Sequence, residues 1–275
     1  MGLSIKDLLY NLFVPRKRCV ICGNPVQRHL KNFSYSKNEM HKRVLHLSNM
    51  CFSCKLQLYI PEEPFCSHCH KPLDENDLAN DEGLCGDCSK ESEKYLDKNR
   101  SMVLYNYFIK EKIALYKYRG QQSLSHGFSY LLKMVYDKYY SDLDIDLITY
   151  VPIHEIRLEE RGFNQGERIA EELQRMTGIS FQETLIKVNP TGKQSKKGKK
   201  ERRKQIAGSL NIIEDIIPLI NGKKILIVDD IYTTGSTLSE CAKVLKESGA
   251  KEVYGLTIAR ATEDKLLEDN VEYLI

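Results

Sequence analysis

Residues 223–238 read KKILIVDDIYTTGSTL, and this stretch predicts the fold. Its apolar run 225–228 is bounded by charge, which is typical of a strand buried on both faces of a parallel sheet. Asp229 and Asp230 follow at the carboxyl end of that strand. A turn of hydroxyls and glycine then leads into an amphipathic helix, expected over residues 238–248. Free backbone N–H groups and the helix dipole favour an anion at such a turn, so the sequence predicts a phosphate-binding loop.

The loop differs from a nucleotide P-loop, because it contains no lysine and no G-x-x-x-x-G-K-[ST] pattern. Adjacent carboxylates suit a polyol, since each can accept hydrogen bonds from ribose hydroxyls. The pattern therefore favours a phosphoribosyl group, with Asp229 and Asp230 on the ribose. The alternative is a solvated strand–turn–helix in which an aspartate caps the helix. The residues expected around the phosphate are Thr233, Thr234, Gly235, Ser236 and Thr237.

Composition describes a soluble globular chain of 275 residues, 29% charged and 41% hydrophobic, with room for one medium domain and one smaller domain. A net charge of +3 is too small to indicate nucleic-acid binding by itself. No apolar run approaches the ~18–20 residues that a membrane span needs. Residues 1–18 are too short and mixed for a signal peptide. They are expected to form a docking helix or a flexible lead-in.

Residues 19–90 form a cysteine-rich region, which holds eight of the nine cysteines as four C-x-x-C pairs. Without a secretory signal disulfides are disfavoured, and such pairs indicate zinc held by thiolates. The sequence therefore predicts two structural zinc ions in a double zinc ribbon. A redox role for one pair is the weaker alternative. The predicted ligands are Cys19, Cys22, Cys51, Cys54, Cys66, Cys69, Cys85 and Cys88.

The preferred grouping is sequential, with the first two pairs on one ion and the last two on the other. Spacing alone leaves crossed groupings open. His68 and His70 could each replace a thiolate, but the complete cysteine set favours a bystander role for both. Because this region has few large apolar side chains, metal binding is expected to supply its folding free energy.

A polar linker is expected over residues 91–100, followed by an α/β domain over residues 101–275. Strands and helices alternate in this domain, which predicts a parallel sheet with helices on both faces. Ligands of such sheets bind outside the carboxyl ends of the strands. The expected strands lie at 102–107, 146–153 and 225–228, and the expected helices at 109–118, 123–140, 167–177 and 238–248.

A second ligand-binding loop is expected after the strand that ends in Val151-Pro152-Ile153. The following segment HEIRLEERGFNQ carries Arg157 and Arg161 at the same edge of the sheet. Tyr232, between the aspartates and the threonines, is a stacking platform or a plain loop residue.

Residues 193–204 are the most basic part of the chain, with eight Lys or Arg among twelve residues. Three hypotheses stay open: a solvated loop, a hood that closes over a pyrophosphate-bearing ligand, and a contact with nucleic-acid phosphates. No aromatic residue interrupts the run, so base stacking is not expected from it. The candidate nucleic-acid contacts are Lys193, Lys196, Lys197, Lys199, Lys200, Arg202 and Arg203.

Taken together, the order of parts resembles the ComF family of late competence proteins, from about residue 19 onward. One departure is visible: Arg203-Lys204-Gln205 stands where the family tends to have Arg-x-Asn, which puts a ligand contact there in doubt. The matching residues are the four C-x-x-C pairs, Lys117 to Gly120 (KYRG), Val151 to Ile153 (VPI), Arg161 to Gln165 (RGFNQ), Thr191, Gln194, Arg202-Arg203, and Asp229 to Thr237 (DDIYTTGST).

The resemblance implies a type I phosphoribosyltransferase-like fold behind the zinc ribbons. Asp229 and Asp230 would hold the ribose of phosphoribosyl pyrophosphate (PRPP), and the threonine-rich loop its 5′-phosphate. The backbone after Val151, Pro152 and Ile153 would take pyrophosphate and Mg²⁺, with Arg157 and Arg161. The transfer needs no protein nucleophile, because positioning and stabilisation of the leaving pyrophosphate supply the catalysis.

It also implies a cytoplasmic factor that handles single-stranded DNA during natural transformation beside a ComFA-type helicase or ATPase. An active phosphoribosyltransferase or amidophosphoribosyltransferase, acting on a small acceptor, is the alternative, since fold alone does not decide enzymatic activity. A purely structural zinc scaffold is the third hypothesis. Phosphoribosyltransferase folds often pair, so an oligomer is compatible with the resemblance.

Overall fold

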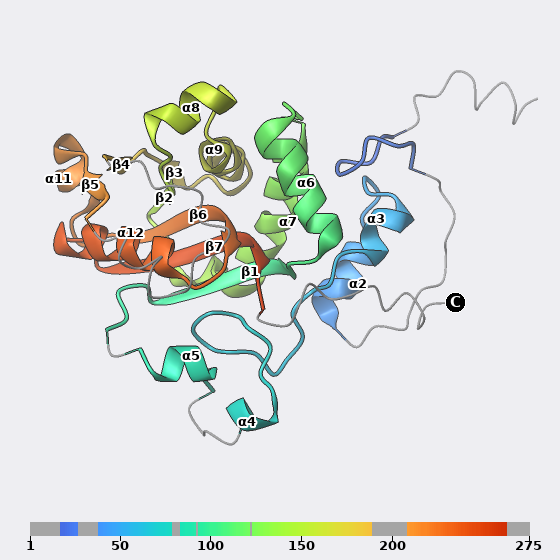
Figure 1. Ribbon diagram of the computed structural model, residues 1–275, viewed down its shortest axis with the longest axis horizontal. Coiled ribbons are helices and arrows are strands. Elements are labelled where there is room, and N and C mark those ends of the chain that lie inside the picture. Colours follow the sequence, from blue (N-terminus) through green and yellow to red (C-terminus); the bar gives the residue numbers. More distant parts are fainter. Residues whose placement is uncertain are drawn as a thin grey trace, which may run out of the picture. The chain divides into compact units, whose positions relative to one another are not determined.

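The computed structural model describes residues 17–26, 38–78, 83–91, 93–121, 123–188 and 208–262. Its main feature is a five-stranded sheet with the order β1-β7-β6-β2-β3, in which every pair of neighbours is parallel. Helices connect and cover these strands (Figure 1). The fold is therefore the parallel α/β arrangement that the alternating sequence pattern predicts.

The strands of the sheet are β1 (Lys98–Leu104), β2 (Leu147–Tyr150), β3 (Ser180–Phe181), β6 (Lys224–Tyr232) and β7 (Glu252–Arg260). A separate antiparallel pair consists of β4 (Leu185–Lys187) and β5 (Leu210–Ile212). The helices of this part of the chain are α6 (Tyr107–Tyr118), α7 (Leu124–Tyr139), α8 (Glu155–Arg161), α9 (Gln165–Thr177), α11 (Ile217–Ile220) and α12 (Ser236–Glu247), with 3-10 turns at Ser141–Leu143 and Glu214–Ile216.

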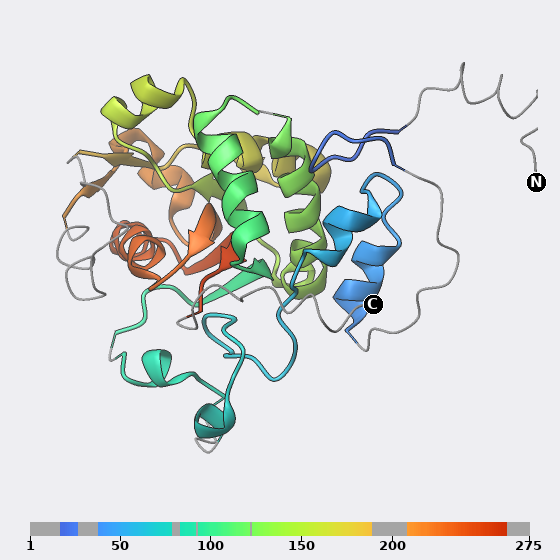
Figure 2. The same cartoon turned by 45° about the vertical axis from the view of Figure 1, so that its right-hand side comes forward.

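The central strand β6 is buried on both faces. Ile225 and Ile227 pack in one core cluster with Leu238 and Leu245 of α12. Leu226 and Val228 alternate with them and are also buried, so they point to the opposite face. On that face α9 contacts β6 and β2, while α7 contacts β1 and β7 (Figure 2). Burial on both faces explains why the strand is continuously apolar.

Two local differences separate the structure from the sequence-based expectation. β1 begins at Lys98, so the last residues of the expected linker are part of the sheet. The segment expected as a loop after β2 contains α8, which starts at the His154 cap and ends at Gly162. His154 Nδ1 accepts a hydrogen bond from the Ile156 N–H at 3.3 Å, and Gly162 has a φ of 74°, so both ends of the helix are capped.

The chain divides into two compact units, residues 1–58 and 59–275. Within the first, α2 (Glu39–Leu45) and α3 (Phe52–Leu56) lie beside the first two C-x-x-C pairs. The second unit holds the sheet together with the last two pairs, which border α4 (Glu75–Leu78) and α5 (Gly86–Ser89). The sequence predicts one region, 19–90, for all four C-x-x-C pairs. In the structure the last two pairs belong to the same compact unit as the sheet. Most of the lead-in 1–18 lies outside the described residues.

Candidate functional site: a phosphate loop and two tetracysteine clusters

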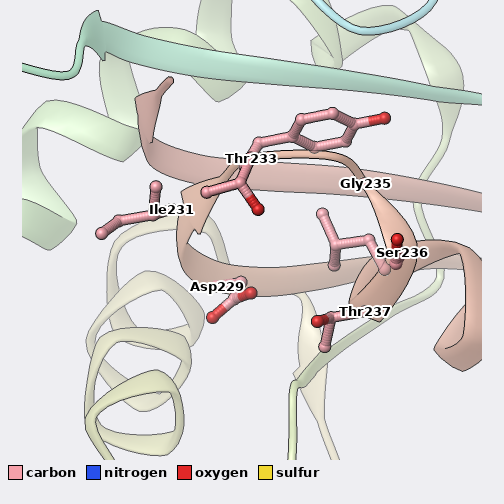
Figure 3. A pocket seen from close by; sticks show the side chains of 8 residues that line it. Asp229, Ile231, Thr233, Gly235, Ser236 and Thr237 are labelled. Carbon is pink, nitrogen blue, oxygen red and sulfur yellow. The ribbon is translucent and has the colours of Figure 1, made fainter. Parts of the chain in front are cut away.

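A small polar pocket lies at the carboxyl end of β6, where the strand gives way to α12 (Figure 3). The strand brings its last residues to the edge of the sheet, and the turn after it places the first residues of the helix opposite them. The pocket is therefore at the place that the sequence predicts for a phosphate loop. Its lining residues are Asp229, Ile231, Tyr232, Thr233, Gly235, Ser236, Thr237 and Leu238.

Gly235 determines the shape of the turn. It caps the N-terminus of α12 with a φ of 76°, in the left-handed region where a side chain is strained. The Tyr232 ring lies directly against it, so that a Cβ on Gly235 would overlap the ring. Glycine is thus required here for both its conformation and its lack of a side chain.

Hydroxyl groups gather around the first turn of α12. The Thr234 and Ser236 hydroxyls are hydrogen-bonded at 2.8 Å, and the Ser236 N–H reaches the Thr234 hydroxyl at 3.5 Å. The first N–H groups of a helix have no partner within the helix, and they carry the positive end of its dipole. Together these donors give the pocket the chemistry of an anion site.

The two carboxylates beside the loop have different environments. Asp230 is buried, at 7% exposed, and forms an ion pair with Lys117 from the end of α6. Asp229 lines the pocket and accepts a hydrogen bond from the Asp230 N–H at 2.8 Å. Burial, followed by the Asp230 charge, raises the pKa of Asp229 to about 7, against the opposing effect of Lys117. The pocket therefore contains an acid that titrates near neutral pH.

Two lysines, Lys117 and Lys187, also belong to this neighbourhood, and the sequence predicts a role at the pocket for neither. Lys117 neutralises Asp230, as described above, and the chain positions differ by more than 100 residues, so spacing could not have paired them. Lys187 of β4 lies close enough for its charge to interact with that of Asp229, and burial lowers the pKa of Lys187. Local sequence carries no signal for either contact, because both depend on the packing of distant elements.

The second predicted loop follows β2, next to β6. The Val151 N–H donates to the Val228 carbonyl at 3.1 Å, which fixes the start of the Val151-Pro152-Ile153 segment beside the phosphate loop strand. The Asn164 side chain donates to the Val151 carbonyl at 3.3 Å and caps α9 by accepting from the Gly166 N–H at 2.9 Å. The asparagine of the RGFNQ motif thus has a structural role.

Neither predicted arginine of α8 is among the residues that line the pocket. Arg157 pairs with Glu160 at 3.0 Å, one turn along the same helix. Arg161 donates to the Tyr118 hydroxyl at 3.2 Å, and its guanidinium stacks on the Tyr118 ring at 5.0 Å from the centroid. Tyr118 is 64% exposed, so its ring is open to solvent.

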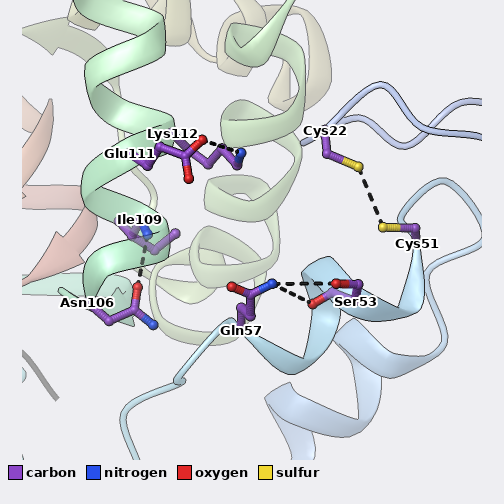
Figure 4. A network of polar contacts seen from close by, with 8 residues as sticks. All are labelled: Cys22, Cys51, Ser53, Gln57, Asn106, Ile109, Glu111 and Lys112. Carbon is purple, nitrogen blue, oxygen red and sulfur yellow. Dashed lines mark hydrogen bonds and ion pairs between the residues drawn. The ribbon is translucent and has the colours of Figure 1, made fainter. Parts of the chain in front are cut away.

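The cysteines form two clusters, and each brings together the four residues that sequential grouping predicts. Within each cluster the ligand atoms lie within 4.8 Å of one another. Figure 4 shows the Cys22 and Cys51 sulfurs, which are 3.6 Å apart, the same distance as between the Cys69 and Cys85 sulfurs. Tetrahedral zinc with bonds of about 2.3 Å to sulfur requires sulfurs roughly 3.8 Å apart, so both clusters fit a zinc ion. Four protein ligands leave no open position, which is typical of a structural metal site.

The two histidines near the second cluster have other partners. His68 Nδ1 lies 3.2 Å from the Asp97 carbonyl, and His70 Nδ1 accepts from the Ser101 N–H at 3.0 Å. Neither belongs to the metal-binding groups found among the described residues. They tie the second cluster to β1, which is consistent with the bystander role. The seven basic residues predicted to contact nucleic acid, Lys193 to Arg203, lie outside the described residues.

No helix among the described residues is both long and apolar enough to cross a membrane.

Comparison with known proteins places these features in a family context. The family model described as phosphoribosyl transferase domain matches residues 159–274. The chain is 32% identical to competence protein ComFC of Bacillus subtilis, an alignment that covers 77% of this chain and 84% of the relative. It is 28% identical to competence protein F of Haemophilus influenzae, covering 79% of this chain and 93% of the relative.

A DNA utilization protein of Escherichia coli, YhgH, is 24% identical over 76% of this chain and 96% of its own length. Among solved structures, an adenine phosphoribosyltransferase aligns with 53% of this chain and 74% of that chain, at 16% identity and a TM-score of 0.36.

Proposed function

The chain belongs to the ComF family of competence proteins, and from this membership we propose that it handles single-stranded DNA during natural transformation. The observation that carries the proposal is the phosphate loop of residues 233–237 at the N-terminus of α12. The backbone of single-stranded DNA presents a series of phosphates, and a helix N-terminus lined by hydroxyls suits one of them. Relatives that are named DNA utilization protein also support a role in DNA handling.

Two further features of the chain suit a single strand. The exposed Tyr118 ring, backed by Arg161, offers a stacking platform for a base. The basic stretch 193–204 supplies positive charge for backbone phosphates. We propose that the loop, the tyrosine and this charge together hold the strand, and that a ComFA-type ATPase is the partner that moves it in the cytoplasm.

Binding of labelled single-stranded DNA to the zinc-loaded chain, followed by fluorescence anisotropy at two salt concentrations, tests this function. We expect salt-sensitive binding, because neutralised phosphates release counterions. Thr233→Asp adds a carboxylate to the exposed rim of the loop and should weaken binding about tenfold, a helix-terminus effect of roughly 1.4 kcal/mol. Ser53→Asp adds the same charge on α3 and serves as the matched control. Absence of binding at low salt would contradict the proposal.

The basic stretch has its own test. Replacing Lys196, Lys197, Lys199 and Lys200 by Glu reverses four charges within residues 193–204. The affinity for single-stranded DNA should fall, and the slope of its logarithm against salt should become shallower as phosphate contacts are lost. Unchanged affinity would remove this stretch from the proposed interface.

An active PRPP-dependent transferase is the second candidate, favoured by the carboxylate pair beside the loop. Asp229 and Asp230 would accept hydrogen bonds from the ribose hydroxyls while the loop holds the 5′-phosphate. Mg²⁺, bound together with PRPP, would neutralise the leaving pyrophosphate. Asp230→Asn should then abolish pyrophosphate release with a suitable acceptor, whereas Asp146→Asn, which alters an exposed pair with Lys223 at 2.9 Å, should not. Pyrophosphate release that survives Asp230→Asn would contradict this role.

A further inference from the structure

Arg260, the last residue of β7, lies between the second cysteine cluster and the phosphate loop. The side chain is buried, at 4% exposed. Its Nε donates to the Cys69 carbonyl at 3.1 Å, and its Nη2 lies 3.3 Å from the Cys69 sulfur. One edge of the guanidinium is therefore attached directly to a predicted metal ligand.

The other edge of the same guanidinium holds the phosphate loop. Its Nη1 donates to the Thr233 carbonyl at 3.0 Å and contacts the Tyr232 carbonyl at 3.4 Å. The guanidinium also stacks on the Tyr232 ring, 4.8 Å from the centroid, and that ring packs against Gly235. A single side chain thus spans the cluster and the turn.

The contacts have a physical consequence for metal binding. Four thiolates around one divalent zinc carry a net negative charge, and a buried arginine, which stays protonated, needs such a partner. Groups that hydrogen-bond to metal ligands orient both the ligands and what lies behind them. Without the metal the four cysteine side chains are no longer held together, so the Cys69 carbonyl and sulfur that anchor Arg260 are free to move.

We propose that the site formed by Cys66, Cys69, Cys85 and Cys88 positions the phosphate loop through Arg260, so that metal binding at this site raises the affinity of the loop for a phosphoribosyl ligand. Arg260 is a positioning residue in this account. The choice of ligand rests on the proposed function, whereas the coupling between cluster and loop does not.

Hydrogen–deuterium exchange of the full chain tests the coupling without any ligand. Cys85→Ser removes a metal ligand other than Cys69, the cysteine that is hydrogen-bonded to Arg260, and should increase exchange at amides 232–237 at least tenfold. Cys51→Ser removes the equivalent ligand of the first cluster, since Cys51 caps α3 as Cys85 caps α5, and should leave these amides unchanged. Metal content should fall from two ions to one in both variants. Equal loop exchange in wild type and Cys85→Ser would overturn the inference.

Arg260→Lys provides a second test in a chain that keeps all its cysteines. Lysine retains the charge but cannot reach the cluster and the two loop carbonyls together. PRPP with Mg²⁺ should bind at least tenfold more weakly by calorimetry, with two zinc ions per chain retained. Unchanged PRPP affinity, in a wild type that binds PRPP, would contradict the proposal.

Arg100→Lys is the matched control. Arg100 is also buried and donates to the Ser67 carbonyl at 2.9 Å, so it attaches the same C-x-x-C turn to β1, but no contact joins it to the loop in the described structure. This variant should keep the wild-type PRPP affinity. If wild-type protein fails to bind PRPP at all, the choice of ligand is wrong. Hydrogen–deuterium exchange at amides 232–237 then tests the coupling by itself: it should be faster in Arg260→Lys than in Arg100→Lys, and equal exchange would contradict the coupling.

Discussion

At the scale of single residues, the two carboxylates of the pocket differ in whether a nearby positive charge neutralises them. Asp230 has Lys117, whereas Asp229 is partly buried without an ion pair among the described residues and carries a raised pKa. The sequence identified both aspartates, because they follow an apolar run directly. It could not pair Lys117 with Asp230, or Arg260 with Thr233, since these contacts join elements far apart along the chain.

The raised pKa of Asp229 predicts a pH-dependent stability. The folded state holds the Asp229 proton with a pKa of about 7, against an ordinary value of 3.8. Because the unfolded chain releases this proton more readily, its contribution to stability is present at pH 4 and is lost as the pH rises to about 7. Urea denaturation of wild type, without Mg²⁺, should lose about 2 kcal/mol more between pH 5 and pH 7.5 than Asp229→Asn does. Parallel pH profiles of the two proteins would contradict the assignment.

Tyr118 makes a separate residue-scale prediction for DNA binding. Its exposed ring should stack on a base, so Tyr118→Ala should weaken binding of single-stranded DNA by about 1–3 kcal/mol. Tyr107, at the other end of α6, is 50% exposed and gives a control of the same chemistry in Tyr107→Ala. Anisotropy titrations that find equal losses for the two variants would show that the stacking platform is wrongly placed.

At the scale of elements, the sequence predicted β6 and α12 well, since a continuous apolar run and a helical period are strong local signals. α8 was missed, although His154 and Gly162 stand at its ends as caps. Most residues of this short helix are charged and none is buried, so its sequence lacks the apolar stripe from which a helix is predicted. The ends of helices and strands differ from the predicted ends by a few residues, because capping and strand pairing determine where an element ends.

The turn between β6 and α12 predicts the result of a paired glycine substitution. Gly235→Ala should destabilise the fold by about 1–2 kcal/mol for the left-handed backbone, and by more because its methyl group displaces the Tyr232 ring. Gly162→Ala has the same backbone cost, with a φ of 74°, but meets no atom within 4 Å. Chemical denaturation should therefore rank Gly235→Ala as clearly the more destabilising change. Equal losses would mean that the ring does not pack against the turn.

At the scale of the whole molecule, the chain consists of two compact units, and each contains one cysteine cluster. Among the described residues 17–26 and 38–58, the buried apolar side chains besides cysteines are few: Ile21, Met40, Val44, Met50 and Leu58. The second unit has the core of a five-stranded sheet in addition to its cluster. The spacing of the cysteines predicted both clusters. It could not predict the division into units 1–58 and 59–275, because that division depends on what the second cluster packs against.

Metal removal should therefore affect the units unequally. On chelation, amides of α2 and α3 should lose their protection from hydrogen exchange, since a small thiolate site supplies most of the folding free energy there. Amides 224–231 of β6 and those of β7 should stay protected by the sheet core. Simultaneous loss of protection in both units would show that they fold as one cooperative body.

We expect one loop, residues 233–237, to bind the phosphates of both DNA and PRPP. Competition measures this most directly: labelled single-stranded DNA bound to the zinc-loaded chain is titrated with PRPP and Mg²⁺, and its anisotropy is followed at constant ionic strength. PRPP should displace the DNA, and Thr233→Asp should lower the affinity of the chain for both ligands. DNA that stays bound while PRPP saturates the chain would contradict a shared phosphate site.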